Sequence, residues 1–325
     1  MPGVPVVRIL VKGAGVAGLT AAWELCRRGA SVTVIDTRDR VGGAASWFAG
    51  GMLAPWCEAE TAGQGVVDFG GTAPQWWSEA LPGHVSTNGT LVVARVRDRA
   101  ELGHFAGRSS GHQRIDATSI ARLEPDLAER FADGLYFPDE AHLDPRAAMQ
   151  ELQRQLTDAG CIFHLGSIVP PEDNYDRIVD CTGLNCSHTD LRGVRGEMLL
   201  LRVDGLILSR PVRLLHPRIP VYVVPRGNGL FMIGATMIES ASAGPATARS
   251  VMELLNAAYA LHPAFGEAVI EEIGVGVRPA FPDNFPRVTR NGETISINGF
   301  YRHGFLLAPA MAARAAGLAL TGRAA

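Results

Sequence analysis

The stretch from Val6 to Asp36 constrains the fold more than any other part of the chain. Residues 6–11 form an apolar, largely β-branched run of the kind found in buried parallel strands, and the pattern G-x-G-x-x-G follows at residues 13–18. Apolar residues at helical spacing come next, then Gly29 as a candidate C-cap and a second apolar strand at residues 31–35. The order strand, glycine turn, helix and strand predicts the first unit of a doubly wound α/β fold.

This unit predicts a binding site for an adenine dinucleotide. In such a turn Gly13 permits the tight bend, Gly15 lets the backbone approach a pyrophosphate, and Gly18 lets the helix pack closely on the strand. The first residues of the helix, Val16 and Ala17, offer backbone N–H donors and a partial positive charge.

Asp36 follows the second strand, eighteen residues after Gly18, where a carboxylate can accept hydrogen bonds from ribose hydroxyls. An acid at this place argues against a ribose 2′-phosphate but leaves NAD and FAD as alternatives. The unit therefore predicts the class of ligand and not its identity.

Composition excludes several classes of function. Of 325 residues, 47% are hydrophobic and 19% are charged, which is typical of a soluble globular chain, and a formal charge of −3 without a basic cluster argues against nucleic acid. The five cysteines lack C-x-x-C or zinc-type spacing, so we expect free thiols and no metal site. The first strand begins so early that we expect no secretory signal and a cytoplasmic location. The apolar run 305–320 contains Pro309 and Arg314, and we expect no membrane anchor there.

The rest of the chain alternates between two kinds of pattern. Residues 56–140 mix short helices and strands, which indicates a second domain. A helix that starts at Asp144 and Pro145 and a strand at residues 177–180 then return to the nucleotide-binding pattern.

Three further β patterns follow between residues 197 and 236, and the segment Arg226-Gly227-Asn228-Gly229 predicts a hairpin between the last two. After a helix at 247–261 and a strand at 269–277, the chain ends with a strand, a turn and a helix over residues 294–320. We therefore predict a dinucleotide-binding domain built from three pieces, with an antiparallel domain inserted between them.

Several segments, in this order, resemble the FAD-dependent D-amino-acid oxidases, and among these most closely the glycine oxidases of thiamine biosynthesis. The resemblance favours FAD over NAD, which the spacing of the glycine motif does not. Besides the N-terminal unit, it rests on residues 50–55, 195–198, 222–226, 233–237, 277–279 and 302–309.

The resemblance implies an α/β fold with a Rossmann-like FAD-binding domain and a substrate-binding domain with a mainly antiparallel sheet. We assign residues 1–48, 141–192 and 274–325 to the former and 49–140 and 193–273 to the latter. The implied reaction moves a hydride from the Cα of glycine, sarcosine or a small D-amino acid to flavin N5, leaves an imine, and reduces oxygen to hydrogen peroxide. An alternative is a dehydrogenase of the same fold that uses another electron acceptor. A homo-oligomer is possible.

Four residues match the substrate site of that family. Arg278 occupies the position of the carboxylate-binding arginine, which suits a planar bidentate donor, and Tyr222 matches the tyrosine whose hydroxyl reaches the same carboxylate. Met237 matches a residue that lines the small pocket, and Arg302 matches a second arginine beside substrate and flavin.

The resemblance also extends the expected cofactor site beyond the glycine motif and Asp36. The helix that begins near Phe305 is a candidate to stabilise negative charge at flavin N1 and the C2 carbonyl oxygen. The chain departs from the family at Asp36, where many relatives carry glutamate, and at His303, where asparagine is common. The segment between residues 163 and 177 is also shorter than is usual in the family, which affects the contacts expected on the adenine side. The added cofactor residues are Thr37, Arg38, Ala44, Ala45, Ser46, Gly51, Met52, Leu53, Thr182, Gly183, Arg302, His303, Gly304, Phe305 and Leu306.

Overall fold

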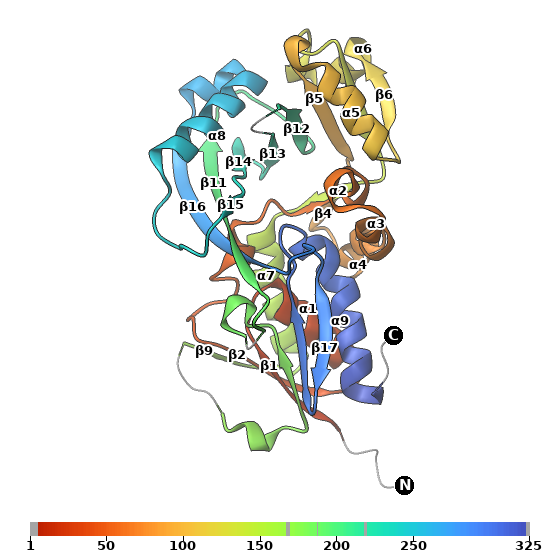
Figure 1. Ribbon diagram of the computed structural model, residues 1–325, viewed down its shortest axis with the longest axis vertical. Coiled ribbons are helices and arrows are strands. Elements are labelled where there is room, and N and C mark those ends of the chain that lie inside the picture. Colours follow the sequence, from red (N-terminus) through yellow and green to blue (C-terminus); the bar gives the residue numbers. More distant parts are fainter. Residues whose placement is uncertain (1–5, 167–169, 187, 218–219, 323–325) are drawn as a thin grey trace.

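Two sheets, one in each half of the molecule, organise the chain (Figure 1). The computed structural model describes residues 6–166, 170–186, 188–217 and 220–322. Residues 167–169 of the shortened segment and Ile219, at the start of one predicted β pattern, lie outside this description. Within it, the predicted fold class is confirmed, because a mainly parallel sheet with helices adjoins a mainly antiparallel one.

The mainly parallel sheet is built from three pieces of the chain, as predicted. Its order is β17-β18-β10-β1-β2-β9, and every neighbouring pair is parallel except β17 with β18. Because β2 and β10 lie on opposite sides of β1, the topological switch point, where such folds bind ligands, falls at the glycine turn after β1. The strands are β1 (Arg8–Lys12), β2 (Ser31–Asp36), β9 (Ile162–Leu165), β10 (Arg177–Asp180), β17 (Arg287–Asn291) and β18 (Thr294–Asn298).

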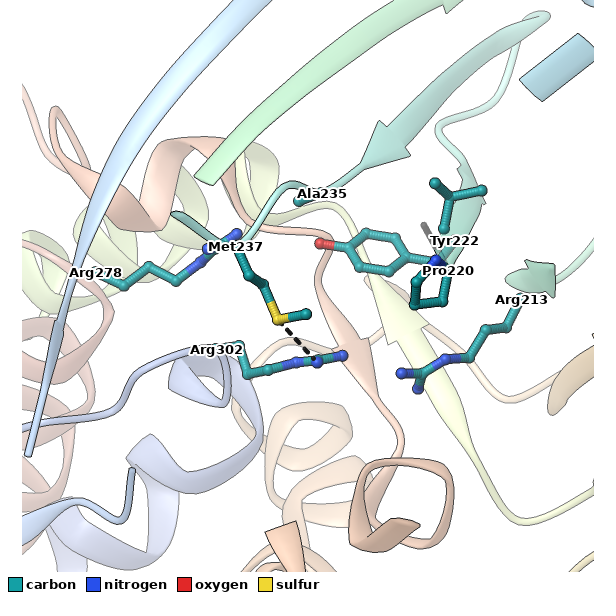
Figure 2. Close-up of a pocket in the computed structure, with 8 residues that line it drawn as sticks. Arg213, Pro220, Tyr222, Ala235, Met237, Arg278 and Arg302 are labelled. Atoms are coloured by element: carbon teal, nitrogen blue, oxygen red, sulfur yellow. Dashed lines mark hydrogen bonds between the residues drawn. The ribbon is translucent and has the colours of Figure 1, made fainter. Parts of the chain in front are cut away.

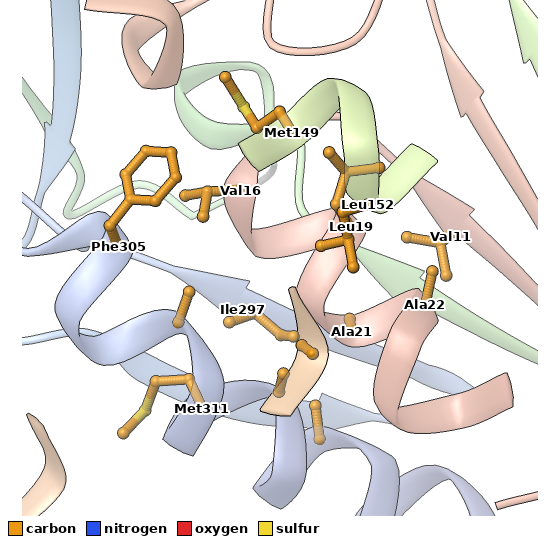
Figure 3. Packing of buried hydrophobic residues seen from close by; sticks show 14 of the residues in the cluster. Val11, Val16, Leu19, Ala21, Ala22, Met149, Leu152, Ile297, Phe305 and Met311 are labelled. Atoms are coloured by element: carbon orange, nitrogen blue, oxygen red, sulfur yellow. The ribbon is translucent and has the colours of Figure 1, made fainter. Parts of the chain in front are cut away.

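Three helices pack over this sheet and form the larger hydrophobic core (Figure 3). They are α1 (Val16–Arg27), α7 (Pro145–Asp158) and α9 (Gly304–Thr321), and α1 contacts both of the others. Helices α1 and α9 can pack closely because both carry small buried residues, such as Ala22 on α1 and Ala315 on α9.

Helix α9 is also, among the described residues, the one helix whose length and apolar composition would let it cross a membrane. The apolar run 305–320, where we expect no membrane anchor, lies within it. However, 61% of its apolar window is buried inside the protein, where it packs on α1 and α4 (Ala73–Ala80). Its hydrophobicity is therefore accounted for by the core.

The second sheet is mainly antiparallel, with the order β15-β11-β14-β13-β12-β5-β7-β6 and with β16 paired to β11. The predicted hairpin at residues 226–229 is confirmed between β13 and β14. Helix α8 (Ala248–Leu261) packs on this sheet over a second core. The strands are β5 (Thr90–Ala94), β6 (Gln113–Asp116), β7 (Asp133–Phe137), β11 (Arg192–Arg202), β12 (Val212–Leu215), β13 (Val221–Pro225), β14 (Leu230–Gly234), β15 (Ile238–Glu239) and β16 (Val269–Ala280).

The remaining elements lie between the two halves, except α5 and α6, which pack on β5, β6 and β7 of the antiparallel sheet. The small sheet of β3, β8 and β4 lies between them, and helices α2, α3 and α4 surround its edge. All five cysteines are free, as expected. These elements are β3 (Met52–Leu53), β4 (Val85–Ser86), β8 (Ala141–Leu143), α2 (Pro55–Ala62), α3 (Gln64–Gly70), α5 (Ala100–Arg108), α6 (Ala117–Leu123) and the short 3-10 helix η1 (Ala45–Phe48).

Helices α3 and α4 pack with the nucleotide half, although our division of the chain gives residues 49–140 to the substrate domain. The fully buried Trp77 of α4 donates from Nε1 to the Phe305 carbonyl at 2.8 Å and belongs to the larger core. Conversely, residues 274–280, which we gave to the FAD-binding domain, continue β16 of the antiparallel sheet. The domain boundaries thus remain a prediction, and packing crosses them at both places.

The glycine turn yields a test of the fold. A Cβ atom at Gly18 would lie 1.8 Å from the Gly13 carbonyl oxygen, so Gly18→Ala must push α1 away from β1. We expect a loss of about 3 kcal/mol or more in the free energy of unfolding, since overpacking against backbone cannot be relieved by a side-chain rotation. Urea denaturation measures this quantity.

The matched control is Gly103→Ala in the exposed helix α5, where a Cβ atom meets nothing within 4 Å. There we expect a gain of about 0.5–1 kcal/mol, because alanine restricts the unfolded chain. Equal effects of the two substitutions would contradict this account of α1.

Candidate active site

The turn after β1 requires its glycines for stated geometric reasons. Gly13 has a φ of 98°, and a Cβ atom there would lie 2.5 Å from the Cys181 carbonyl oxygen at the end of β10. A residue with a side chain could occupy this position only if the backbone moved, because of both this φ and this contact. The turn therefore lies directly against β10, at the switch point of the sheet.

The N-terminus of α1 is free to bind an anion. Its N-cap is Gly15, which has no side chain to cap the helix, and the first turn carries no acidic residue. Ser46 Oγ accepts a hydrogen bond from the Val16 N–H at 3.2 Å, which brings η1 beside the turn. The first-turn N–H groups that Ser46 does not occupy and the helix dipole together favour a phosphate group at this place.

Asp36 is held close to the turn by the backbone. Its Oδ2 accepts from the Ala14 N–H at 2.8 Å, and its Oδ1 accepts from the Arg38 N–H at 2.9 Å. A carboxylate can accept about four hydrogen bonds in all, so these contacts leave capacity for ribose hydroxyls. The ribose role of Asp36 stays a prediction.

A second helix N-terminus converges on the same region. Helix α9 has His303 as its N-cap without a side-chain capping bond, and a Cβ atom at Gly304 would lie 3.4 Å from Val16 Cγ1 at the start of α1. Two positive helix ends thus lie side by side.

The other expected cofactor residues fall into two groups. Thr182 is positioned next to the turn, since its N–H and Oγ1 both donate to Asp180 Oδ1, at 2.9 and 2.6 Å. By contrast, the side chains of Leu53, Phe305 and Leu306 are buried in the larger core, so their backbone atoms are what they offer to a cofactor. The segments 37–46 and 51–53 flank these positions, and the contacts expected of them remain predictions.

Four side chains expected to act on the substrate line one pocket (Figure 2). Arg278 comes from β16, Tyr222 from β13, Met237 from the segment after β14, and Arg302 from the turn before α9. Tyr222 directs its hydroxyl toward the side of the pocket where Arg278 lies. The fold thus brings together residues separated by up to eighty positions in the chain; the roles expected of them stay predictions.

Arg278 occupies a space that the neighbouring strand leaves open. A Cβ atom at Gly196 of β11 would lie 2.1 Å from Arg278 Nη2, so the glycine there makes room for the guanidinium. Arg278 Nη1 donates to the Thr236 carbonyl at 3.2 Å. Burial lowers the pKa of this arginine, as expected for a cation with little water around it.

Met237 contacts both polar residues of the last turn. Its sulfur accepts from the Tyr301 hydroxyl at 3.3 Å and from Arg302 Nη1 at 3.5 Å. Tyr301 has a φ of 51°, in the left-handed region that few non-glycine residues adopt. Met237 therefore fixes the orientation of Arg302 on one side.

Sequence reasoning missed the residues that hold Arg302 on its other side. Glu58 of α2 accepts from Arg302 Nη2 and from Arg213 Nη1, both at 3.0 Å, and its Oε2 lies 3.0 Å from Arg302 Nε. Glu58 is 5% exposed and Arg213, which also lines the pocket, is 5% exposed. Burial by itself would raise the pKa of Glu58, but Arg302, Arg213 and His303 lower it to about 2. The carboxylate is therefore ionised at all ordinary pH values.

A signal for one of these residues was present in the sequence. Arg213 interrupts the apolar run of β12, Val212-Arg213-Leu214-Leu215, and a charge in a buried strand needs a partner. Nothing local indicated that this partner was Glu58, which lies 155 positions earlier in the chain.

His303 completes the cluster as a neutral side chain. It is 2% exposed, and its Nδ1 lies 3.4 Å from Glu58 Oε2. Burial lowers its pKa to about 4, with Arg302 and Arg213 acting in the same direction and Glu58 opposing them. A charged imidazole is thus disfavoured beside two guanidinium groups.

Comparison with known proteins decides the family. The family model for FAD-dependent oxidoreductases matches residues 8–318. This chain belongs to the FAD-dependent oxidoreductase family. It is 58% identical over 317 residues to a Rhizobium etli protein named as a thiamine biosynthesis oxidoreductase, ThiO, and the match covers 97% of each chain.

More distant relatives agree in fold. The oxidoreductase is 24% identical to the glycine oxidase of Bacillus licheniformis, with 93% of this chain and 89% of the relative covered. The crystal structure of glycine oxidase from Geobacillus kaustophilus superposes with a TM-score of 0.78 at 21% identity, over 97% of this chain and 95% of that one.

The residues of the oxidoreductase fit its FAD cofactor. The close packing at Gly13 and the two adjacent helix N-termini at Val16 and Gly304 form a cradle suited to phosphates and to an electron-rich ring. The pocket of Arg278 and Tyr222 adjoins this cradle, because Arg302 immediately precedes the start of α9. The expected substrate pocket and the expected cofactor cradle are therefore contiguous.

The buried imidazole predicts how stability depends on pH. The pKa of His303 is lower in the folded protein than its usual 6.5. The stability that the neutral imidazole contributes to the folded protein is therefore fully present above pH 6.5 and is lost as pH falls toward 4. At about 1.4 kcal/mol per pKa unit, His303→Asn should remove up to about 3 kcal/mol from the fall in unfolding free energy between pH 6.5 and 4.

Urea denaturation at several pH values measures this difference. His104→Asn is the control, since it makes the same change at an exposed residue of α5, outside the buried cluster of Glu58. An unaltered pH dependence in His303→Asn would show that the imidazole is not kept neutral by its surroundings.

Proposed function

We propose that this oxidoreductase oxidises the Cα–N bond of a small amino acid, glycine, sarcosine or a small D-amino acid, and that it serves thiamine biosynthesis. The names of the Rhizobium relative and of the glycine oxidases support this choice. The observation that carries it is the pairing of Arg278 and Tyr222 at one pocket beside the cofactor cradle.

The pocket suits a substrate with a single carboxylate and a short side chain. A guanidinium and a phenolic hydroxyl directed to one point bind a carboxylate with defined geometry, and this fixes the position of the adjacent Cα. Met237 and Ala235 restrict the space around that carbon. A substrate held in this way presents its Cα to the ring site at the start of α9.

Bound FAD supplies the hydride acceptor for this chemistry. The protein contributes orientation through Arg278, Tyr222 and Arg302 and excludes water with the apolar lining. The N-terminal end of α9 stabilises the negative charge that develops on the cofactor side. The amine must be neutral when its Cα reacts, and the positive charges of Arg278 and Arg302 favour the neutral amine over the ammonium form.

We further propose oxygen as the electron acceptor, with hydrogen peroxide as the product. The alternative is a dehydrogenase of the same fold that reduces a quinone or dye. Purified protein with bound FAD, assayed with glycine, sarcosine and D-alanine, tests both steps: absence of flavin bleaching would refute amino-acid oxidation, and dye reduction without peroxide would favour the dehydrogenase.

Arg278 gives a quantitative test of the site. Arg278→Ala should raise KM for the amino acid by a factor that corresponds to about 2–5 kcal/mol, because the carboxylate loses a bidentate charged partner. Arg278→Lys is the matched control, which keeps the charge, loses the bidentate geometry and should be intermediate. Steady-state kinetics measure both, and an unchanged KM in Arg278→Ala would remove this residue from the substrate site.

A further inference from the structure

The substrate pocket contains more positive charge than a substrate with one carboxylate requires. Three guanidinium groups line it, those of Arg213, Arg278 and Arg302. Arg278 pairs with Tyr222 at one side, whereas Arg213 and Arg302 extend into the pocket from opposite sides, with their guanidinium groups toward one another (Figure 2). Two like charges in such a place are unfavourable unless an anion lies between them.

Glu58 is the anion that lies between them. One of its oxygens, Oε1, accepts from both arginines at 3.0 Å, and the other lies 3.0 Å from Arg302 Nε. The side chains of Glu58 and Arg213 are 6% and 7% exposed, so water screens this cluster weakly. The carboxylate comes from α2, while the two guanidinium groups come from β12 and from the turn before α9.

We propose that Glu58 is a specificity-determining residue: its carboxylate takes the place of a second substrate anion between Arg213 and Arg302, so that the pocket selects amino acids with one carboxylate over those with two. This inference rests on the proposed function for the class of substrate. It assigns Arg213 and Arg302 to a latent second anion subsite that the protein fills with its own side chain.

The charges around the pocket support this assignment. His303 contacts Glu58 but is neutral, so it does not add to the positive charge. With Glu58 ionised and one substrate carboxylate on Arg278, the three arginines retain one uncompensated charge, which suits a cofactor that becomes negative on reduction. A second substrate carboxylate would compete with Glu58 for the same donors and would meet a like charge at close range.

The experiment compares two simple probes, acetate with one carboxylate and malonate with two. Dissociation constants for the FAD-loaded protein are measured by isothermal titration calorimetry and by the change in flavin absorption. Glu58→Gln keeps the shape of the side chain and removes its charge. In this variant we expect the affinity for malonate, relative to the affinity for acetate, to rise at least about tenfold.

Two further variants test the origin of that gain. Adding Arg213→Met to Glu58→Gln should abolish it, because one of the two donors is lost. Arg213→Met alone should lower the ratio of malonate affinity to acetate affinity, because the charge of Glu58 is then balanced by Arg302 only. This single variant keeps the proposal testable if Glu58→Gln does not retain FAD, and an unchanged ratio there would overturn it.

The matched control is Glu124→Gln. Glu124 and Arg210 form another buried ion pair, with Nε and Oε1 2.7 Å apart, and both lie outside the residues that line the pocket. This substitution should lower stability without altering the ratio. A gain for malonate in Glu124→Gln equal to that in Glu58→Gln would show a general effect of charge loss and would overturn the proposal.

The results separate this inference from the proposed function. If wild-type protein oxidises no small amino acid but Glu58→Gln gains affinity for malonate, the second anion subsite stands and the proposed reaction fails. If the wild-type protein oxidises glycine and the ratio in Glu58→Gln equals that of the wild type, the reaction stands and the role of Glu58 is wrong.

Discussion

The close approach of α1 to the turn after β1 is the contact on which the rest of the structure depends. With no Cβ at Gly18, the first turn of α1 lies against the Gly13 carbonyl, and Gly13 in turn lies against the end of β10. This contact sets the position of α1, α1 sets the position of α9, and the start of α9 carries Arg302 into the pocket. The position of Arg302 in the pocket thus depends on backbone contacts that begin at the other end of the chain.

The glycine unit and the hairpin could be predicted because local rules govern them. A tight turn needs glycine at fixed spacing, and Asn228 and Gly229 have the positive φ values that the connection between β13 and β14 requires. Both signals lie within a few residues, so no knowledge of the distant chain was needed. The same holds for the start of α7, where Asp144 accepts from the N–H groups of Arg146 and Ala147.

Local rules did not predict the residues of the pocket. Arg278, Tyr222, Met237 and Arg302 were singled out by resemblance to a family, not by any spacing that could reveal their proximity. Glu58 was not predicted as a site residue, because its partners Arg213 and Arg302 lie 155 and 244 positions away. They approach it only through the packing of three separate elements. The same reason explains why the packing of Trp77 against α9 was not foreseen: an aromatic residue in a short helix does not indicate which core it joins.

The long ladder of β11 and β16 has a mechanical consequence. The two strands pair from Arg202 with Val269 to Arg192 with Ala280, with one register shift between Leu200 and Leu201. Ala280 also bridges to Phe300, just before the turn that carries Arg302. A hinge between the halves would have to distort this ladder of backbone hydrogen bonds. The ladder and the bridge thus couple the antiparallel sheet to the turn before α9. We therefore expect the distance between the cradle at the start of α9 and the pocket of Arg278 to vary little.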